Sequence, residues 1–174
     1  SGDRRVDQVR ETLTARLLDL YDRTATENWP WFEETATYDN ARLSQALIVS
    51  GHGVGNPRSL EIGLRTLRWL LEVQRSPHGH LRPIGSNGFY PRGGKCAQFD
   101  QQPLEVLAII SACIAAWTVT ADVAWLAEAR LAFEWFMGRN DLGLEVYDAG
   151  TGGCRDGLHQ DRVNQNQGAE STLA

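Results

Sequence analysis

In several segments of this chain, apolar residues recur every three or four positions. Long segments without this period lie between them. Residues at this spacing share one face of a helix, so the periodic stretches predict amphipathic or buried helices. Local signals mark some of their ends, such as the Asn56-Pro57 pair, an N-cap followed by proline at the first helical position. The predicted helices are 4–24, 38–51, 57–76, 103–120, 122–137 and 167–174.

The predicted helices differ in how much charge they carry. Helices 4–24, 57–76 and 122–137 have charged residues opposite an apolar face. Helix 103–120 has no charge after Glu105 and is predicted to be buried on every side, and helix 38–51 has only Arg42. Two concentric layers would produce this alternation, with the charged helices outside. We therefore predict one all-α domain over residues 1–174, arranged as an α/α toroid of helical hairpins, although a plain bundle could also bury one helix.

Two long connections, 76–102 and 138–165, are rich in glycine and aromatic residues. Connections of this length inside a compact domain are usually functional or disordered, and their aromatic content favours order. The second is predicted to contain a short β-hairpin, in which 144–147 pairs with 154–158 around a glycine-rich turn.

Three polar segments, rich in acids and amides, lead directly into apolar helices. They are 38–43 (YDNARL), 99–104 (FDQQPL) and 164–169 (NQNQGA), and their aligned last residues are 61 and then 65 positions apart. A period of this length suggests an array of helical hairpins with long connections. We therefore expect the three segments to lie on one rim, where their polar groups can form a binding cleft.

Composition and charge exclude several classes of protein. A hydrophobic content of 42% and a charged content of 22% are ordinary for a globular protein. A net charge of −5 without a basic stripe argues against nucleic acid as a partner. The longest apolar run is too short to span a bilayer, and no signal-peptide pattern opens the chain. Three cysteines without regular spacing give no disulfide framework, so we expect a cytoplasmic location.

Five motifs resemble the six-hairpin (α/α)6-barrel glycosidase-like superfamily. They are 29–33 (WPWFE), 38–40 (YDN), 99–102 (FDQQ), 152–159 (GGCRDGLH) and 164–172 (NQNQGAEST). The chain is most similar to a subgroup attached to, or encoded as the C-terminal part of, bacterial glycosyltransferases. The resemblance implies a carbohydrate ligand.

The likeness covers most of the chain but only about three of the six hairpins of a full barrel. Half a barrel would leave apolar helix faces uncovered, at a cost of roughly 25 cal/mol per Å². We therefore expect the chain to belong to a longer polypeptide or to assemble with another chain, such as a glycosyltransferase domain.

Glycoside hydrolysis needs two carboxyl groups, one as proton donor and one as base or nucleophile. Asp39, Asp100 and Glu170 belong to the polar segments or directly follow them, and they are the candidate catalytic residues. Acids at helix N-termini also serve as caps and dipole partners, and for any single acid this structural role is favoured. Further acids lie nearby in the sequence: Glu33, Glu34, Glu105, Asp156 and Asp161.

Aromatic, amide and basic side chains from the same regions could stack on sugar rings, bind hydroxyl groups or hold an anionic group. The candidate substrate-binding residues are Trp31, Tyr38, Asn40, Tyr90, Arg92, Gln101, Gln102, Arg155, His159, Asn166 and Gln167. Most aromatic residues of such a chain belong to the core, and single loop arginines are usually solvated. Cys96, Cys154 and His159 could ligate zinc, as in cyclases built on a related toroid, but their spacing is irregular. We predict neither a metal site nor a cofactor.

The leading hypothesis is a carbohydrate-active domain that binds an oligosaccharide and hydrolyses it by carboxylate acid–base catalysis. One alternative is a non-catalytic glycan-binding or scaffolding domain of a glycosyltransferase. Another is a sugar epimerase, which would need a histidine pair formed by His159 with His52 or His78. Two carboxyl groups facing each other at roughly 5–10 Å would favour hydrolysis, whereas acids turned into helix caps would favour the binding domain.

Overall fold

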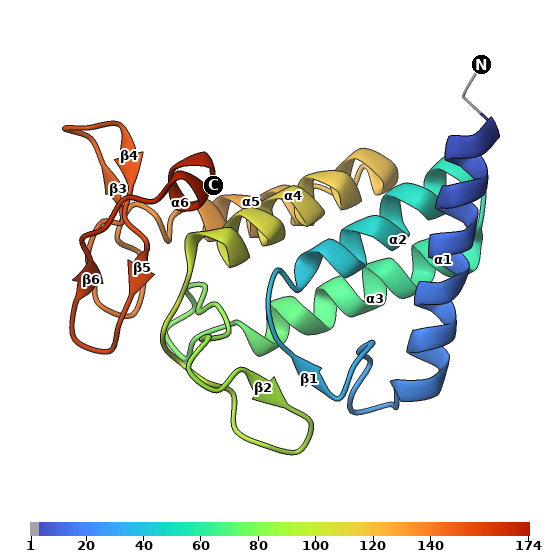
Figure 1. Cartoon of the computed structure of the whole chain (residues 1–174), viewed down its shortest axis with the longest axis horizontal. Helices are drawn as coiled ribbons and strands as arrows, with labels where there is room; N and C mark the ends of the chain where they lie inside the picture. Colours follow the sequence, from blue (N-terminus) through green and yellow to red (C-terminus); the bar gives the residue numbers. More distant parts are fainter. Residues whose placement is uncertain (1–3) are drawn as a thin grey trace.

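The computed structural model describes residues 4–174, and over that range six helices hold about half of the residues (Figure 1). The helices are α1 (Arg4–Thr24), α2 (Ala41–Val54), α3 (Pro57–Val73), α4 (Pro103–Thr120), α5 (Ala124–Phe133) and α6 (Ala169–Leu173). Short strands pair antiparallel as β1 (Thr35–Ala36) with β2 (Tyr90–Pro91), β3 (Tyr147–Asp148) with β4 (Gly153–Cys154), and β5 (Gly157–Leu158) with β6 (Val163–Asn164). The prediction of a mostly helical chain is confirmed.

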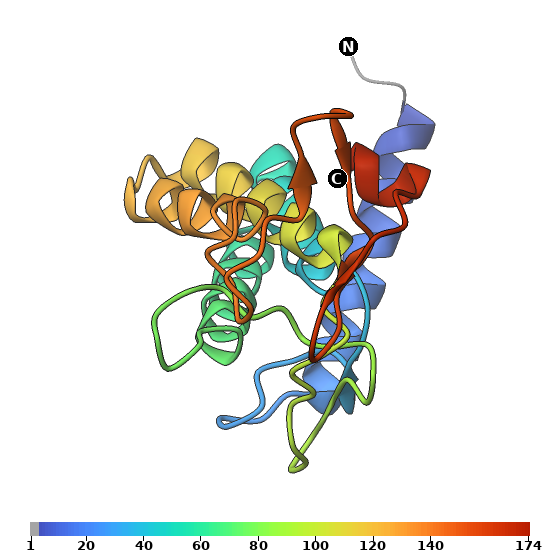
Figure 2. The same ribbon diagram turned by 90° about the vertical axis from the view of Figure 1, so that its left-hand side faces the viewer.

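Helices α2 and α4 run side by side with their N-termini toward the same end of the molecule (Figure 1). Helix α3 returns along α2, α5 returns along α4, and α1 packs across α2. The segments carrying β3 to β6 and α6 gather at the end where α2 and α4 begin, and Figure 2 looks onto that end. The polar segments that precede α2 and α4 therefore face the same loops.

Local sequence signals explain the start of α3 and the end of α2. Helices α1 and α3 begin where predicted, and the side chain of Asn56 caps α3 by accepting the Ser59 N–H at 3.1 Å. The predicted end of α2 at Gly51 is wrong, since α2 continues to Val54 and ends at Gly55, whose φ is 68°. Gly51 allows α2 and α3 to approach closely, because a Cβ there would lie 2.6 Å from the Leu60 nitrogen.

The last two helices are shorter than predicted. Helix α5 ends at Phe133 because the hydrogen bonds that follow are three residues apart, including Phe136 N–H to Phe133 O at 3.1 Å. Asp122 lies before α5 and accepts the Ala124 N–H at 3.0 Å. Helix α6 begins at Ala169, two residues later than expected.

The predicted β-hairpin has the right location and register but the wrong extent. Tyr147 pairs with Cys154, so the ladder begins at the last residue of 144–147 and continues into the turn. Residues 157–158 pair with 163–164 in a second ladder. The chain therefore makes two short hairpins in this connection where one was predicted.

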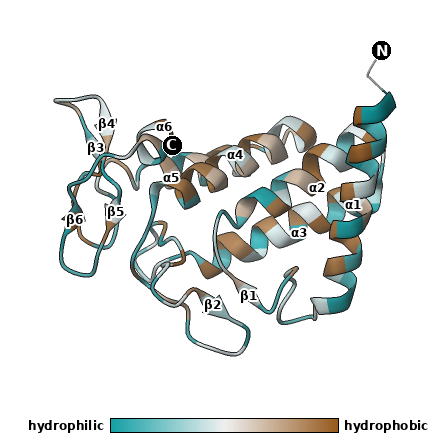
Figure 3. Cartoon of the chain, viewed as in Figure 1, coloured by the Kyte–Doolittle hydropathy of each residue, from teal (hydrophilic) through white to brown (hydrophobic). Residues whose placement is uncertain are grey.

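Helix α4 is not buried on every side, contrary to the prediction. Ile114 and Trp117 are 44% and 38% exposed, because no described element covers this side of the C-terminal half of α4. Figure 3 shows α4 as mostly apolar, whereas polar and apolar positions alternate along α1. Among the described residues, α4 alone is long and apolar enough by composition to cross a membrane, and it packs here against α2 and α5.

Candidate functional site

The first polar segment meets the acids that directly follow the other two, at the N-terminal ends of α2 and α4. Glu105, in the first turn of α4, accepts hydrogen bonds from the backbone N–H groups of Asp39 and Asn40 and from Asn40 Nδ2 at 3.1 Å. Tyr38 donates its hydroxyl to Glu170 Oε2 of α6 at 3.1 Å. We call these five residues the acidic rim.

Helix geometry explains why Glu105 occupies this position. Pro103 is the first residue of α4, which places Glu105 at its third position, near the positive end of the helix dipole. Asn40 makes no capping bond within α2, and its side-chain amide donates to Glu105 instead. One carboxyl group therefore interacts with the N-termini of two parallel helices, which compensates for its burial at 2% exposure.

Burial and nearby carboxyl groups raise the pKa values of Glu105, Asp39 and Tyr38. Burial raises the pKa of Glu105 to about 7, although the hydrogen bonds from Asn40 and Asp39 oppose this. Burial also raises the pKa of Asp39, against the effect of Arg42 at 3.3 Å and with a contribution from Glu170. The pKa of Tyr38 rises to about 12 through burial, then through its hydrogen bond to Glu170 and the nearby carboxylates.

This arrangement suits proton transfer. A carboxyl group that titrates near pH 7 can give or take a proton under neutral conditions. Glu170 is exposed, whereas Asp39 is about two-thirds buried, so the two carboxyl groups occupy different environments. Different environments for neighbouring carboxyl groups are what separate an acid from a base in acid–base catalysis.

Asp100, the third predicted catalytic residue, lies outside the acidic rim. Its Oδ1 is 2.5 Å from Nδ1 of His159, and both side chains are partly exposed. The neighbouring Gln102 donates from Nε2 to Ser86 Oγ at 3.3 Å. The structure thus pairs one predicted catalytic residue with one predicted substrate-binding residue.

Gln101 is fully buried and belongs to a separate polar network. Its Nε2 donates to Asp141 Oδ2 at 2.6 Å, and its Oε1 accepts the Trp135 indole N–H at 2.8 Å. Asp141 also accepts Nε of Arg82 at 2.9 Å through both oxygens and lies 3.0 Å from Nε2 of His80. We call Gln101, Asp141, Arg82 and His80 the Asp141 hub.

The Asp141 hub joins the loop after α3, the start of α4 and the loop after α5. Burial favours the protonated form of Asp141, but the hydrogen bonds from Arg82, Gln101 and His80 outweigh it and lower the pKa of Asp141. Gln101 therefore holds the fold together at this point and presents no free amide to a ligand.

Three further candidates stabilise the β3–β4 hairpin and the segment before α6. Arg155 and Gln167 both bind Asp148 Oδ2, at 3.3 and 2.9 Å. Asn166 donates to Asp156, which also accepts the Gly168 N–H at the start of α6. These side chains fix the position of Glu170 rather than offer free groups.

The remaining candidates lie near β1 and β2. Trp31 is fully buried and packs 5.2 Å from the ring of Trp69, so it has no free face for a sugar. Tyr90 is half-buried and stacks on Trp69 at 6.3 Å. Arg92 forms an ion pair with Glu34 at 3.2 Å. None of these three side chains contributes a hydrogen bond to the acidic rim.

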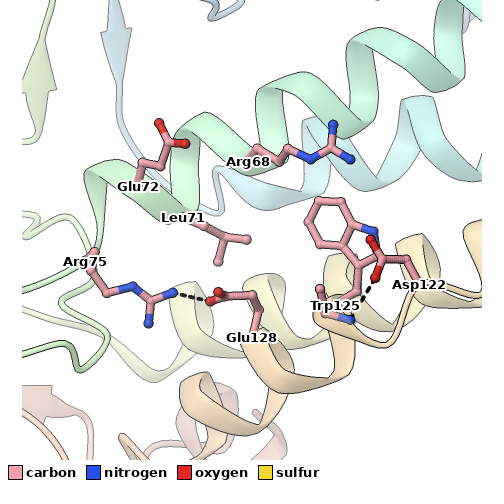
Figure 4. Close-up of a pocket in the computed structure, with 8 residues that line it drawn as sticks. Arg68, Leu71, Glu72, Arg75, Asp122, Trp125 and Glu128 are labelled. Atoms are coloured by element: carbon pink, nitrogen blue, oxygen red, sulfur yellow. Dashed lines mark hydrogen bonds and ion pairs between the residues drawn. The ribbon is translucent and has the colours of Figure 1, made fainter.

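Several grooves have volumes near that of a small ligand, and two of them border the helix pairs. One, of about 460 Å³, lies between α3 and α5, where Arg75 pairs with Glu128 and the Arg68 guanidinium lies 5.2 Å from the ring of Trp125 (Figure 4). The other, of about 450 Å³, is apolar and borders α4, α5, β4 and α6. Asp39, Asp100 and Glu170 line neither groove. Within residues 4–174 no three His, Cys, Asp or Glu side chains are grouped so that they could hold a metal ion.

Glu105 is the central residue of the rim, although sequence reasoning placed it only among the nearby acids. One feature of the sequence singles out Glu105: no charged residue follows it until Asp122. No family model and no curated protein matches the chain. The acidic rim is therefore the basis for assigning a function.

Proposed function

We propose that this chain is a carbohydrate-active domain of an α/α toroid, with its ligand at the N-terminal ends of α2, α4 and α6. The observation that carries the proposal is that residues 38–40 meet Glu105 and Glu170, the acids that directly follow the other two polar segments. The parallel course of α2 and α4, with α3 and α5 returning beside them, supports the toroid.

Asp39 and Glu170 are the proposed acid and base. Burial and the charge of Glu170 favour the protonated form of Asp39 by raising its pKa, so Asp39 donates a proton to the departing glycosidic oxygen. Glu170 takes a proton from the water that attacks the anomeric carbon, and the Tyr38 hydroxyl orients its carboxyl group. Glu105 acts through Asp39 and Asn40, because its oxygens bind their N–H groups.

A glycan-binding or scaffolding domain without catalysis is the second candidate. The specific observation in its favour is that Glu105 caps α2, as a purely structural acid would. The epimerase alternative has less support, because His159 contacts Asp100 instead of another histidine, while His78 stacks on His80 at 6.3 Å.

A glycan array combined with a hydrolysis screen tests the proposal. The variants are Asp39→Asn and Glu170→Gln, with Glu61→Gln on the exposed side of α3 as the matched control. We expect both rim variants to lose about 10²- to 10⁴-fold in turnover, as is usual when an acid or base is removed, and the control to keep it. Glycan binding without turnover in the unmodified protein would select the binding domain, and neither binding nor turnover would overturn the carbohydrate assignment.

A further inference from the structure

Asp100 and His159 face each other across a short antiparallel bridge. Gln101 N–H donates to Leu158 O and Leu158 N–H donates to Gln101 O, both at 2.9 Å. In antiparallel pairing, the residue before one partner lies opposite the residue after the other. This register brings Asp100 Oδ1 to 2.5 Å from His159 Nδ1. The other ring nitrogen, Nε2, forms no hydrogen bond with any residue from 4 to 174.

The backbone around Asp100 is held tightly on two sides. Its carbonyl accepts the Ser86 N–H at 3.0 Å. A Cβ on Gly85 would lie 1.9 Å from the carbonyl oxygen that precedes Asp100, and a Cβ on Gly157 would lie 2.0 Å from the carbonyl oxygen that follows it. Only glycine permits such approaches, so two loops clamp the segment that carries Asp100. Fixed backbone on both partners preorganises the Asp100–His159 pair.

The described residues hold a second aspartate–histidine pair, Asp141 with His80, whose surroundings indicate a structural role. His80 is 8% exposed, and its partner Asp141 is shared with the cation of Arg82. The side chains of His159 and Asp100 are 31% and 40% exposed, and the ion pairs of residues 4–174 give Asp100 no partner besides His159. A solvent-accessible imidazole with one free nitrogen and a dedicated carboxylate is the arrangement of a general base.

We propose that Asp100 and His159 form a proton-transfer dyad that hydrolyses carboxylic esters. His159 is the catalytic residue and Asp100 is a positioning residue. A water oxygen bonds to the ester carbonyl carbon while its proton moves to His159 Nε2, and Asp100 stabilises the imidazolium. The carbon–oxygen bond to the alcohol then breaks, and the same proton passes from Nε2 to the departing oxygen. Ester and water become acid and alcohol, without an oxidant or a metal.

On a carbohydrate, this activity would remove an acyl group from a sugar hydroxyl, separately from any cleavage at the acidic rim. A sugar ester as the substrate rests on the proposed function, whereas ester hydrolysis by the dyad does not. A simple activated ester therefore tests the dyad without a sugar.

The experiment measures hydrolysis of p-nitrophenyl acetate by the full chain and by His159→Gln and Asp100→Asn, with His52→Gln and His78→Gln as controls. We expect His159→Gln and Asp100→Asn to lower the protein-dependent rate by about a hundredfold, and the controls to stay within about twofold. An unchanged rate in His159→Gln would overturn the proposal, whatever the glycan screen finds. A negative glycan screen with intact ester turnover would overturn only the carbohydrate assignment.

Nitrogen NMR of the His159 ring gives a readout that loss of folding cannot mimic. The unmodified protein should show a single neutral tautomer with the proton on Nδ1, because Asp100 accepts it. Asp100→Asn should produce a mixture of tautomers. A proton on Nε2 in the neutral ring of the unmodified protein would contradict the dyad even if both variants failed to fold.

Discussion

Glu105 and Asp141 are both shielded carboxyl groups near the start of α4, yet their surroundings act on them in opposite directions. Glu105 accepts only neutral N–H groups, and burial raises its pKa to about 7. Asp141 is bound by the Arg82 guanidinium as well as by Gln101 and His80, and its pKa is lowered despite burial. Burial therefore raises a carboxyl pKa to near neutral pH in Glu105, where no bound cation opposes it, but not in Asp141, where Arg82 does.

Removal of the Asp141 carboxylate should have the largest effect on stability. Asp141→Ala leaves Arg82 without its partner and breaks the bond to Gln101, so we expect a loss of about 3–5 kcal/mol in the free energy of unfolding. Chemical denaturation measures this loss in the free energy of unfolding. Asp161→Ala is the matched control, because its ion pair with Arg162 is exposed and should contribute less than about 1 kcal/mol. Equal losses in the two variants would contradict a structural role for the hub.

Glu105 should make stability fall as pH rises. Its pKa is near its ordinary value of about 4.5 in the unfolded chain and about 7 in the folded protein, so the folded state binds more protons between these values. The carboxylate form is thus penalised on folding, and the cost grows from about pH 4.5 and levels off above about pH 7. The total is on the order of 3 kcal/mol.

Glu105→Gln isolates this effect, because glutamine does not titrate. Subtracting the variant's free energy of unfolding from that of the unmodified protein should give a difference that falls steadily between pH 4.5 and 7. A flat difference over this window would show that Glu105 titrates normally in the folded protein. Asp141 should behave in the opposite way: its contribution, present above its unfolded pKa, is lost as pH falls through its lower folded pKa.

The smallest expected effect concerns the phenol of Tyr38. Glu170→Gln removes the carboxylate that accepts its hydroxyl, so the pKa of Tyr38 should fall from about 12 toward 10. It should not reach 10, because burial is the largest cause of the increase. Ultraviolet titration of the phenols follows this change, with Glu134→Gln on the turn after α5 as the control. A Tyr38 pKa that stays at 12 in Glu170→Gln would show that the two side chains do not interact in solution.

The sequence allowed the helices to be predicted because their apolar period and their caps are local properties. The similar position of the polar segments before apolar helices predicted that they meet, and residues 38–40 do contact the acids that follow the other two segments. Asp100 and Gln101 of the second segment lie outside this cluster. The central role of Glu105 could not be predicted, because it depends on which helix N-terminus lies opposite it in space. The same holds for Gln101, an amide of a polar segment that the fold buries against Trp135.

The role of Gly51 also depended on neighbours that the sequence does not reveal. Glycine commonly follows the last residue of a helix, so the sequence predicts a helix end at Gly51, but in the fold Gly51 lies where α2 and α3 approach closely. Burial of one face was also overestimated along α4, because composition cannot show whether any element covers Ile114 and Trp117. These errors share a cause: the neighbour that decides the outcome is remote in sequence.

The hydrogen bond between Tyr38 and Glu170 joins residues 132 positions apart. On a ribosome that adds 5–20 residues per second, the second partner follows the first by roughly 7–26 s. Through that interval the nascent chain can already pair α2 with α3 and α4 with α5, but the rim still lacks Glu170. Completion of the rim thus follows the pairing of these helices, and a nascent chain that stalls between the two events would carry its folded helices without this part of the site.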